Sequence, residues 1–322
     1  MFKIYSQLTK FGIVIFAVLA GIAGYASSYR IEEAFSIQHF LTFVGGLYFL
    51  SSGSLALNQV QEWKLDQLMP RTKNRPLASG KLKPLAGFIL SMALLMAGLI
   101  LLFKLTTVCG LVSLASVFLY NVCYTMFWKR KWVFAAVPGA IPGALPVTIG
   151  FAANDINIFS PASIYLFMIL FLWQMPHFWM IAIRFKDDYE LGGIPTLPVA
   201  LGVEKTLFHV GLYTFVYAGV ALMAPFFLQV SWTFALFVFP FAFMLLKEFF
   251  KVQKSASRSK YPSIVCMAPA SRRAGLTSIS MNSSSRIRRS FVNARFFWMD
   301  SLSRLSATRG SNPKTNPMSK SM

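Results

Sequence analysis

Residues 58–76 read Asn58-Gln-Val-Gln-Glu62-Trp-Lys64-Leu-Asp66-Gln-Leu-Met-Pro70-Arg71-Thr-Lys73-Asn74-Arg75-Pro76, at the end of a long apolar run. A helix that continues out of this run places Asn58, Glu62 and Asp66 on one face, because they are spaced by four residues. Pro70 ends the helix, and a basic loop follows. One interpretation is a solvated helix end with compensated charges. We favour a functional site, because charge at the end of a membrane span is costly.

The residue types in this stretch suit a metal and a phosphate. Side-chain oxygens on one helix face are ligands for a hard cation, and Mg²⁺ commonly shares itself with substrate phosphates. The bases of the following loop supply donors for phosphate oxygens. Together they describe a metal–diphosphate site.

The remainder of the chain is strongly apolar. Of its 322 residues, 56% are hydrophobic and only 13% are charged, whereas soluble domains are about 45–50% apolar and about 25% charged. This composition argues against a soluble globular enzyme. Eight apolar runs are long enough to be membrane helices, and they predict an all-α, polytopic transmembrane bundle; they cover residues 11–28, 39–57, 84–103, 106–127, 132–153, 162–183, 207–228 and 231–250.

The net charge of +20 is unevenly distributed. Residues 255–322 hold 12 of the 31 Lys and Arg residues, 17 serines and a single acid, Asp300. We therefore divide the chain into a membrane domain, residues 1–254, and an atypical Ser/Arg-rich tail, residues 255–322. A frameshifted or replaced C-terminus explains the tail; a disordered arm attracted to anionic lipid is the alternative. The basic balance indicates a lipid bilayer as partner and no nucleic acid.

The loops give the predicted orientation. Basic residues gather after the second, fourth and sixth runs, as in Lys129-Arg130-Lys131, and the other loops carry few. The positive-inside rule then places the N-terminus and the charged loops in the cytoplasm. We expect a multi-pass protein of a bacterial cytoplasmic (inner) membrane.

A second acidic loop follows the sixth run. Asp187 and Asp188 come shortly after the run Trp173-Gln174-Met-Pro-His177-Phe. Adjacent aspartates repel each other, so a cation or a basic partner is their natural stabiliser. Because both acidic loops follow even-numbered runs, they can face each other and hold two metal ions around one diphosphate. His177 is interpreted as either a packing residue or a ligand, and Trp173 as either core or cavity lining.

Four segments, in order, resemble the UbiA superfamily of intramembrane prenyltransferases and, within it, the branch that farnesylates haem. They are Asn58–Leu77, Tyr124-Thr125 before Lys129-Arg130, Trp173–Phe178 and Asp187–Pro195. The resemblance extends over about residues 10–250. It implies a nine-helix bundle with a cavity between the two acidic regions, so a ninth span is missing where the tail begins. The sequence departs from the superfamily's pattern at Glu62, a position where the superfamily more often has Asp.

The resemblance implies the reaction and its residues. Farnesyl diphosphate and haem B would give haem O and diphosphate, and a haem A synthase or terminal oxidase would use the product. The implied catalytic residues and Mg²⁺ ligands are Asn58, Glu62, Asp66, Asp187 and Asp188. The implied diphosphate-binding residues are Arg71, Lys73, Asn74, Arg75, Lys129 and Arg130. The implied lining of the haem or prenyl cavity is Tyr124, Trp173, Gln174 and His177.

Two other functions stay open on the sequence. A related UbiA-type enzyme could prenylate a quinone precursor or another aromatic acceptor, since physical chemistry does not choose between flat acceptors. A transporter with acidic gates is the other. Transporter sites lie near the bilayer midplane on broken helices, whereas these carboxylates follow helix ends on one side.

Overall fold

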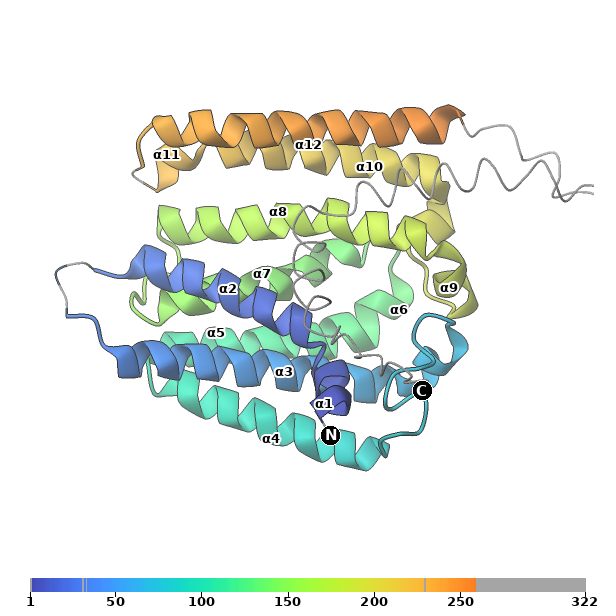
Figure 1. The fold of residues 1–322 in the computed structure, drawn as a ribbon, viewed down its shortest axis with the longest axis horizontal. Helices are drawn as coiled ribbons and strands as arrows, with labels where there is room; N and C mark the ends of the chain where they lie inside the picture. The colour runs from blue at the N-terminus through green and yellow to red at the C-terminus, as the bar shows by residue number, and fades with distance from the viewer. Residues whose placement is uncertain (1, 31, 33, 229, 259–322) are drawn as a thin grey trace, which may run out of the picture. The chain divides into compact units, whose positions relative to one another are not determined.

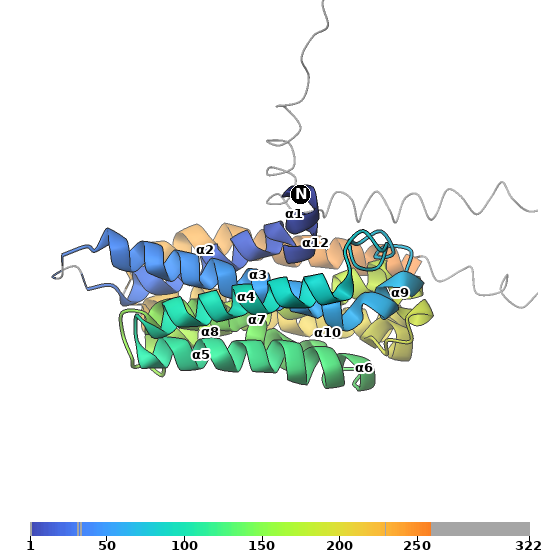
Figure 2. The same cartoon turned by 90° about the horizontal axis from the view of Figure 1, so that it is seen from below.

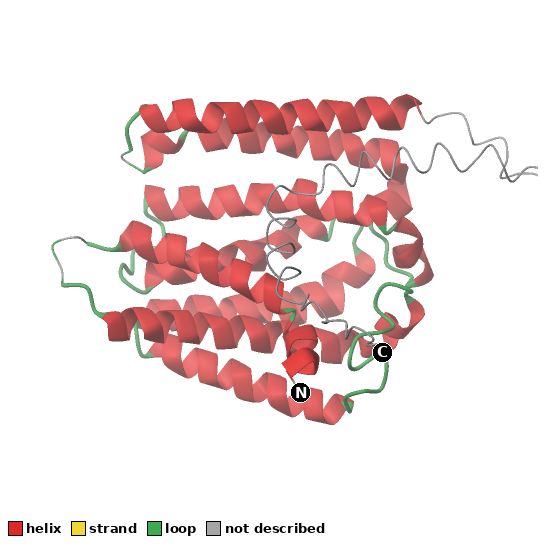
Figure 3. Ribbon diagram, in the orientation of Figure 1, coloured by secondary structure: helices red, strands yellow, loops and turns green. Residues whose placement is uncertain are grey.

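The computed structural model describes residues 2–30, 32, 34–228 and 230–258, and over these residues it contains helices and no strand (Figure 3). This confirms the predicted all-α fold. The helices are α1 (Phe2–Thr9), α2 (Phe11–Ser28), α3 (Ile37–Leu68), α4 (Pro84–Phe103), α5 (Thr107–Val117), the π-helical segment η1 (Phe118–Trp128), α6 (Lys129–Lys131), α7 (Ala136–Ala152), α8 (Pro161–Arg184), α9 (Lys186–Leu191), α10 (Leu197–Leu222), α11 (Ala224–Phe227) and α12 (Thr233–Arg258).

The chain forms two units. Residues 1–246 make one compact unit, and residues 247–322 make the second, of which the structure describes only the last turns of α12. The proposed tail, residues 255–322, therefore lies outside the described residues except for 255–258, which continue α12.

Each of the eight predicted runs corresponds to helical structure. Six helices are long and apolar enough to cross a membrane: α2, α3, α4, the continuous helix Thr107–Lys131, α8 and the part of α12 up to Lys254. The shorter α7 is also apolar. One difference is α10, predicted over 207–228 but bounded by Leu197 and Leu222, with a kink at Gly202, whose φ of 82° is not helical. The early turns of α10 carry the charged residues Glu204 and Lys205. A search for uninterrupted apolar residues therefore does not detect them as part of the helix.

Small residues let α2 and α7 pack at very short range. A Cβ atom added to Gly150 would lie 1.9 Å from the carbonyl oxygen of Gly21, and one added to Gly24 would lie 1.9 Å from that of Val147. Because lipid is as apolar as the side chains, close backbone packing of this kind replaces the hydrophobic effect in holding membrane helices together. Next to this pair α3, α4 and α5 run alongside one another (Figures 1 and 2).

The charged ends of the helices gather at one end of the first unit. In Figure 1 the loop after α3 lies beside α9, and α6 lies at the same end of the unit. The backbone N–H of Arg71 in this loop donates to Asp188 Oδ2 of α9 at 3.2 Å. The two acidic regions, more than 100 residues apart in the sequence, are thus joined as predicted.

Candidate functional site

The first charged motif forms one buried face of α3. Asn58, Glu62 and Asp66 are 3%, 2% and 1% exposed. They lie within a single continuous helix, as the four-residue spacing predicts. Burying two carboxylates is strongly unfavourable unless each one has a cation and hydrogen-bond donors.

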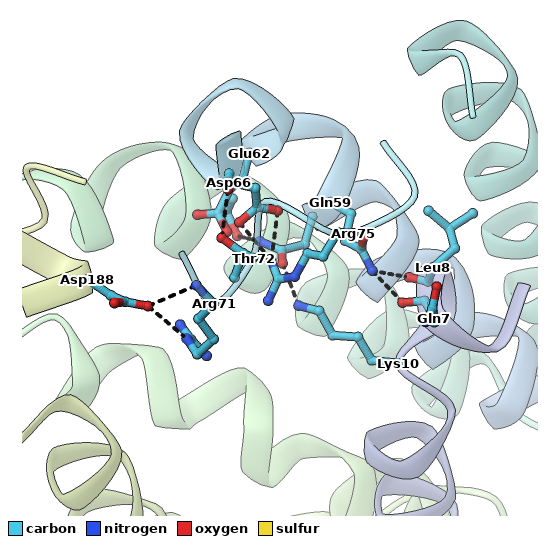
Figure 4. Close-up of polar contacts among 12 residues, drawn as sticks. Gln7, Leu8, Lys10, Gln59, Glu62, Asp66, Arg71, Thr72, Arg75 and Asp188 are labelled. Carbon is cyan, nitrogen blue, oxygen red and sulfur yellow. Dashed lines mark hydrogen bonds and ion pairs between the residues drawn. The ribbon is translucent and has the colours of Figure 1, made fainter. Parts of the chain in front are cut away.

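Both buried carboxylates are paired with bases. The ammonium of Lys129 lies 2.6 and 2.8 Å from the two oxygens of Glu62. One guanidinium nitrogen of Arg75 lies 2.8 Å from each oxygen of Asp66, and Figure 4 shows this pair beside Glu62. We call these two ion pairs the α3 charge pairs. They bring together four of the residues that the sequence assigns to metal and diphosphate.

Lys10 joins this site, and the sequence analysis missed it. Its ammonium donates to Asn58 Oδ1 at 3.0 Å, and its backbone is left-handed, with φ of 53°. Burial, together with the neighbouring Arg75, lowers the pKa of Lys10 to about 7, and the nearby carboxylates only partly oppose this shift. A lysine in front of a membrane helix is ordinary under the positive-inside rule, so the sequence carries no signal for this role.

Helix α1 is attached to the same face of α3. Gln59 is 1% exposed, and its amide nitrogen donates to the carbonyl oxygens of Gln7 and Leu8, both at 2.7 Å. These two bonds hold the end of α1 immediately before Lys10. The N-terminal segment is therefore part of the site's structure.

The second acidic loop contributes Asp188. In addition to the backbone contact, the Arg71 Nε atom lies 4.0 Å from Asp188 Oδ2. The Arg71 side chain also donates to the Tyr189 hydroxyl at 3.4 Å, and its guanidinium lies 4.7 Å from the Phe185 ring centre. Asp187 is exposed, as are Lys73 and Asn74 on the facing loop. Of the two adjacent aspartates, Asp188 is therefore the one that contacts the first loop.

The remaining predicted residues occupy several places. Arg130 donates to the Gln61 carbonyl oxygen at 3.4 Å, next to the α3 charge pairs. Trp173 stacks between Phe16 of α2 and His177, with ring centres 5.3 and 4.8 Å apart. Gln174 donates to the carbonyl oxygens of Ala140 and Leu170. Tyr124, the other predicted cavity residue, lines a cavity with Lys129 and Tyr189.

A buried polar network that the sequence analysis also missed supports α3 against η1. The Ser54 hydroxyl donates to Asn121 Oδ1 at 2.6 Å, and the Asn121 amide donates to the Ser54 carbonyl at 2.9 Å. Asn58 Nδ2 donates to the Thr125 hydroxyl at 3.2 Å. Asn58 is therefore held from two sides, by Lys10 and by Thr125. Its orientation is fixed before any ligand binds.

The donor chemistry fits Mg²⁺ only together with a phosphate ligand. Within the described residues, no three His, Cys, Asp or Glu side chains lie close enough to form a metal cluster on their own. Mg²⁺, however, is commonly bound through one or two carboxylates, with waters and substrate phosphates completing the shell. Glu62 and Asp66, on successive turns of α3 with Asn58 before them, meet that requirement.

Comparison with known proteins places these features in context. The model of the UbiA prenyltransferase family matches residues 13–268. The chain is 63% identical over 261 residues to the protoheme IX farnesyltransferase of Bdellovibrio bacteriovorus, covering 81% of this chain and 89% of that protein. It is 35% identical over 206 residues to the protoheme IX farnesyltransferase of Listeria welshimeri, covering 63% and 68%.

Solved structures support the same fold. A digeranylgeranylglyceryl phosphate synthase has a TM-score of 0.63 at 19% identity, covering 80% of this chain and 91% of that one. A UbiA homologue from Archaeoglobus fulgidus bound to GPP and Mg²⁺ has a TM-score of 0.62 at 16% identity, covering 78% and 88%. At these identities the likeness concerns the fold alone.

Proposed function

This chain belongs to the UbiA prenyltransferase family and transfers a farnesyl group from farnesyl diphosphate to the vinyl group of haem B, forming haem O and diphosphate; we propose that the α3 charge pairs are the centre of this reaction. The high identity to a protein named for haem farnesylation favours haem over a quinone precursor as the acceptor. Membership of an enzyme family also removes the reason to consider a transporter.

The observation that carries the proposal is that each buried carboxylate forms an ion pair with a base. Both members of such a pair can take new partners, the carboxylate a metal ion and the base a diphosphate. Glu62 and Asp66 are neutralised by Lys129 and Arg75 without any ligand. If magnesium and diphosphate bind together, the two carboxylates would be the partners of the cation and the two bases would be the partners of the anion. Each buried charge keeps a partner throughout, so the exchange avoids the cost of several kcal/mol that an unpaired buried charge carries.

The surrounding bases complete the diphosphate site. Arg71, Lys73, Asn74 and Arg75 belong to one loop, and Lys129 and Arg130 approach from the end of η1. Donors in this arrangement stabilise the negative charge that develops on the leaving diphosphate, which is the main task in ionising an allylic ester. Asp188 positions Arg71, and Asp187 next to it supplies a further carboxylate facing solvent.

Asn58, Glu62, Asp66, Asp187 and Asp188 are the residues that would hold magnesium, which would supply charge neutralisation of the leaving group. The protein residues bind the diphosphate oxygens and fix the reacting end of the prenyl chain beside α3. The bond between the farnesyl carbon and the diphosphate oxygen breaks, and the vinyl group of haem B bonds to that carbon. Water then adds its hydroxyl to the cation left beside the porphyrin ring and releases a proton, which gives the hydroxyethylfarnesyl group. Tyr124, Trp173, Gln174 and His177 line the space for the two organic substrates in this proposal.

The proposal includes a location. The described helices make an integral multi-pass membrane protein. The basic loops favour a reaction at the cytoplasmic side of a bacterial inner membrane, which is part of the proposal. Haem O released there passes to a haem A synthase or to a terminal oxidase.

A membrane assay tests the function. Membranes containing the protein are incubated with haem B, farnesyl diphosphate and Mg²⁺, and the porphyrins are identified by mass. A product heavier than haem B by a farnesyl group and a hydroxyl group is expected, and it should disappear when EDTA is added. If haem B stays unchanged while a quinone precursor is prenylated in the same membranes, the assignment of haem B as the acceptor is wrong.

A further inference from the structure

Helix α3 and the π-helical segment η1 run in the same direction and are joined by a ladder of polar contacts. In each of three rungs the two partners lie 67 positions apart in the sequence. The rungs are Ser54 with Asn121, Asn58 with Thr125, and Glu62 with Lys129. Residues spaced by four lie one above another on a helix, so the three rungs together fix one register between α3 and η1. The last rung is one of the α3 charge pairs.

The π-helical turn of η1 sets the direction of the Thr125 hydroxyl, which is in the middle rung. A π-helix joins backbone groups five residues apart, and such turns are frequent at functional sites. The Thr125 hydroxyl donates to the carbonyl oxygen of Tyr120, five residues earlier, at 2.8 Å. In an α-helix a threonine hydroxyl bonds to the carbonyl three or four residues earlier, so this bond depends on the π-helical geometry.

The same hydroxyl determines which way the Asn58 amide faces. A hydroxyl has a single proton, and that of Thr125 is donated to Tyr120. Toward Asn58 the hydroxyl can therefore only accept, and it accepts from Nδ2 at 3.2 Å. The amide oxygen then faces the Lys10 ammonium at 3.0 Å. Because an ammonium can only donate, both partners of Asn58 require the same orientation of its amide.

This orientation decides whether Asn58 can serve as a metal ligand. Mg²⁺ takes oxygen ligands, and the Asn58 oxygen is directed to Lys10, whose ammonium also interacts electrostatically with Glu62. Lys10 would compete with magnesium for this oxygen, since both carry positive charge. The Thr125 bond engages the nitrogen at the other side of the amide. It is therefore the contact of Asn58 that metal binding leaves intact.

We propose that Thr125 is a positioning residue of the metal–diphosphate site, whose hydroxyl holds the Asn58 amide with its oxygen toward the metal ion. The inference rests on the proposed function and extends it to a residue that touches neither substrate nor metal. Thr125 is 0% exposed, so it acts through Asn58. Hydrogen-bond partners of metal ligands typically contribute about 10- to 100-fold to metal affinity.

The test compares Thr125→Val, which removes the hydroxyl at nearly the same shape, with Thr125→Ser, which keeps it. The matched control is Thr214→Val, in a threonine that is also buried but whose hydroxyl bonds to the Val210 carbonyl within α10. Mn²⁺ is titrated with inorganic diphosphate into the detergent-solubilised protein, and unbound Mn²⁺ is measured by electron paramagnetic resonance. We expect Thr125→Val to weaken Mn²⁺ binding about tenfold, and Thr125→Ser and Thr214→Val to bind it as the parent chain does.

A double-variant cycle shows whether Thr125 acts through Asn58. On an Asn58→Ala background, Thr125→Val should weaken Mn²⁺ binding no further, because the amide that Thr125 positions is gone. If Thr125→Val does not fold, Thr125→Ala removes the hydroxyl without adding bulk and takes its place. An equal loss on both backgrounds, or unchanged Mn²⁺ binding in the hydroxyl-free variant, overturns the proposal.

The readout separates this inference from the proposed function, because Mn²⁺ and diphosphate bind without haem. If the parent chain forms no haem O but the variants lose Mn²⁺ binding as expected, the positioning role of Thr125 is supported and the acceptor assignment alone is wrong. If the parent chain does not bind Mn²⁺ with diphosphate, the metal–diphosphate site and the role of Thr125 are both wrong.

Discussion

The Lys10 ammonium lies 3.0 Å from Asn58 Oδ1, so the turn between α1 and α2 reaches the first charged motif. Lys10 adopts a left-handed backbone, φ 53°, which costs a non-glycine residue about 1–3 kcal/mol and persists only where the surroundings enforce it. The bonds from Gln59 to Gln7 and Leu8 provide that enforcement. The strain and the contact together make Lys10 part of the working site.

Removing the Lys10 ammonium should weaken prenyl diphosphate use. Lys10→Met keeps the length of the side chain but removes the donor to Asn58 and one positive charge beside the diphosphate site. We expect kcat/KM for farnesyl diphosphate to fall about tenfold or more. Lys3→Met, in an exposed lysine of α1, is the matched control. Equal kinetics for the two variants would remove Lys10 from the site.

Loosening α1 should reduce activity through the same residue. Gln59→Leu removes both hydrogen bonds to the end of α1 and leaves the carbonyls of Gln7 and Leu8 without that donor. Amide hydrogen exchange over residues 2–9 should become faster, and activity should fall in parallel. The control is Gln67→Leu, in another glutamine of α3, which removes a single hydrogen bond to the carbonyl oxygen of Ala78. This variant should leave the exchange over residues 2–9 unchanged. Protection that survives in Gln59→Leu would show that α1 is held by other contacts.

Breaking one partner of a buried charge pair should cost more than removing both. Lys129→Met leaves Glu62 buried and unpaired, a penalty of about 3–5 kcal/mol, whereas Lys129→Met combined with Glu62→Gln leaves no charge behind. Thermal unfolding in detergent should therefore show a large loss for the single variant and a partial recovery for the double variant. Neither variant should form haem O, because both lack the Lys129 ammonium and the double variant also lacks the Glu62 carboxylate.

The control for this comparison is a surface pair. Lys251 and Glu248 of α12 also form an ion pair, but their side chains are 59% and 46% exposed. Exposed pairs contribute about 0–1 kcal/mol, so Lys251→Met should hardly change the unfolding temperature. A loss equal to that of Lys129→Met would contradict the burial argument.

Local patterns in the sequence predicted the α3 face and the helices, but not the partners across the fold. Spacing by four residues fixes a face, so Asn58, Glu62 and Asp66 were predictable. The pairing of Glu62 with Lys129 joins residues 67 positions apart, and no local pattern encodes it. The segment Trp173–Phe178 resembles the family as one unit, yet the helix turns Trp173 toward Phe16 of α2 while Phe178 lines the cavity.

The adjacent aspartates should behave differently without substrate and alike with it. Asp188 accepts from the Arg71 backbone and pairs with its side chain, whereas Asp187 is exposed. Asp188→Asn removes the charge that holds the 69–83 loop against α9, so trypsin should cleave faster after Arg71 and Lys73 in the ligand-free protein. Asp187→Asn should be cleaved at the parent rate. During turnover both variants lose a carboxylate proposed to hold magnesium, so both should need more Mg²⁺ for half-maximal haem O formation. An unchanged Mg²⁺ requirement in Asp187→Asn alone would restrict the second acidic region's role to Asp188, whose contribution would then be to position Arg71 for the diphosphate.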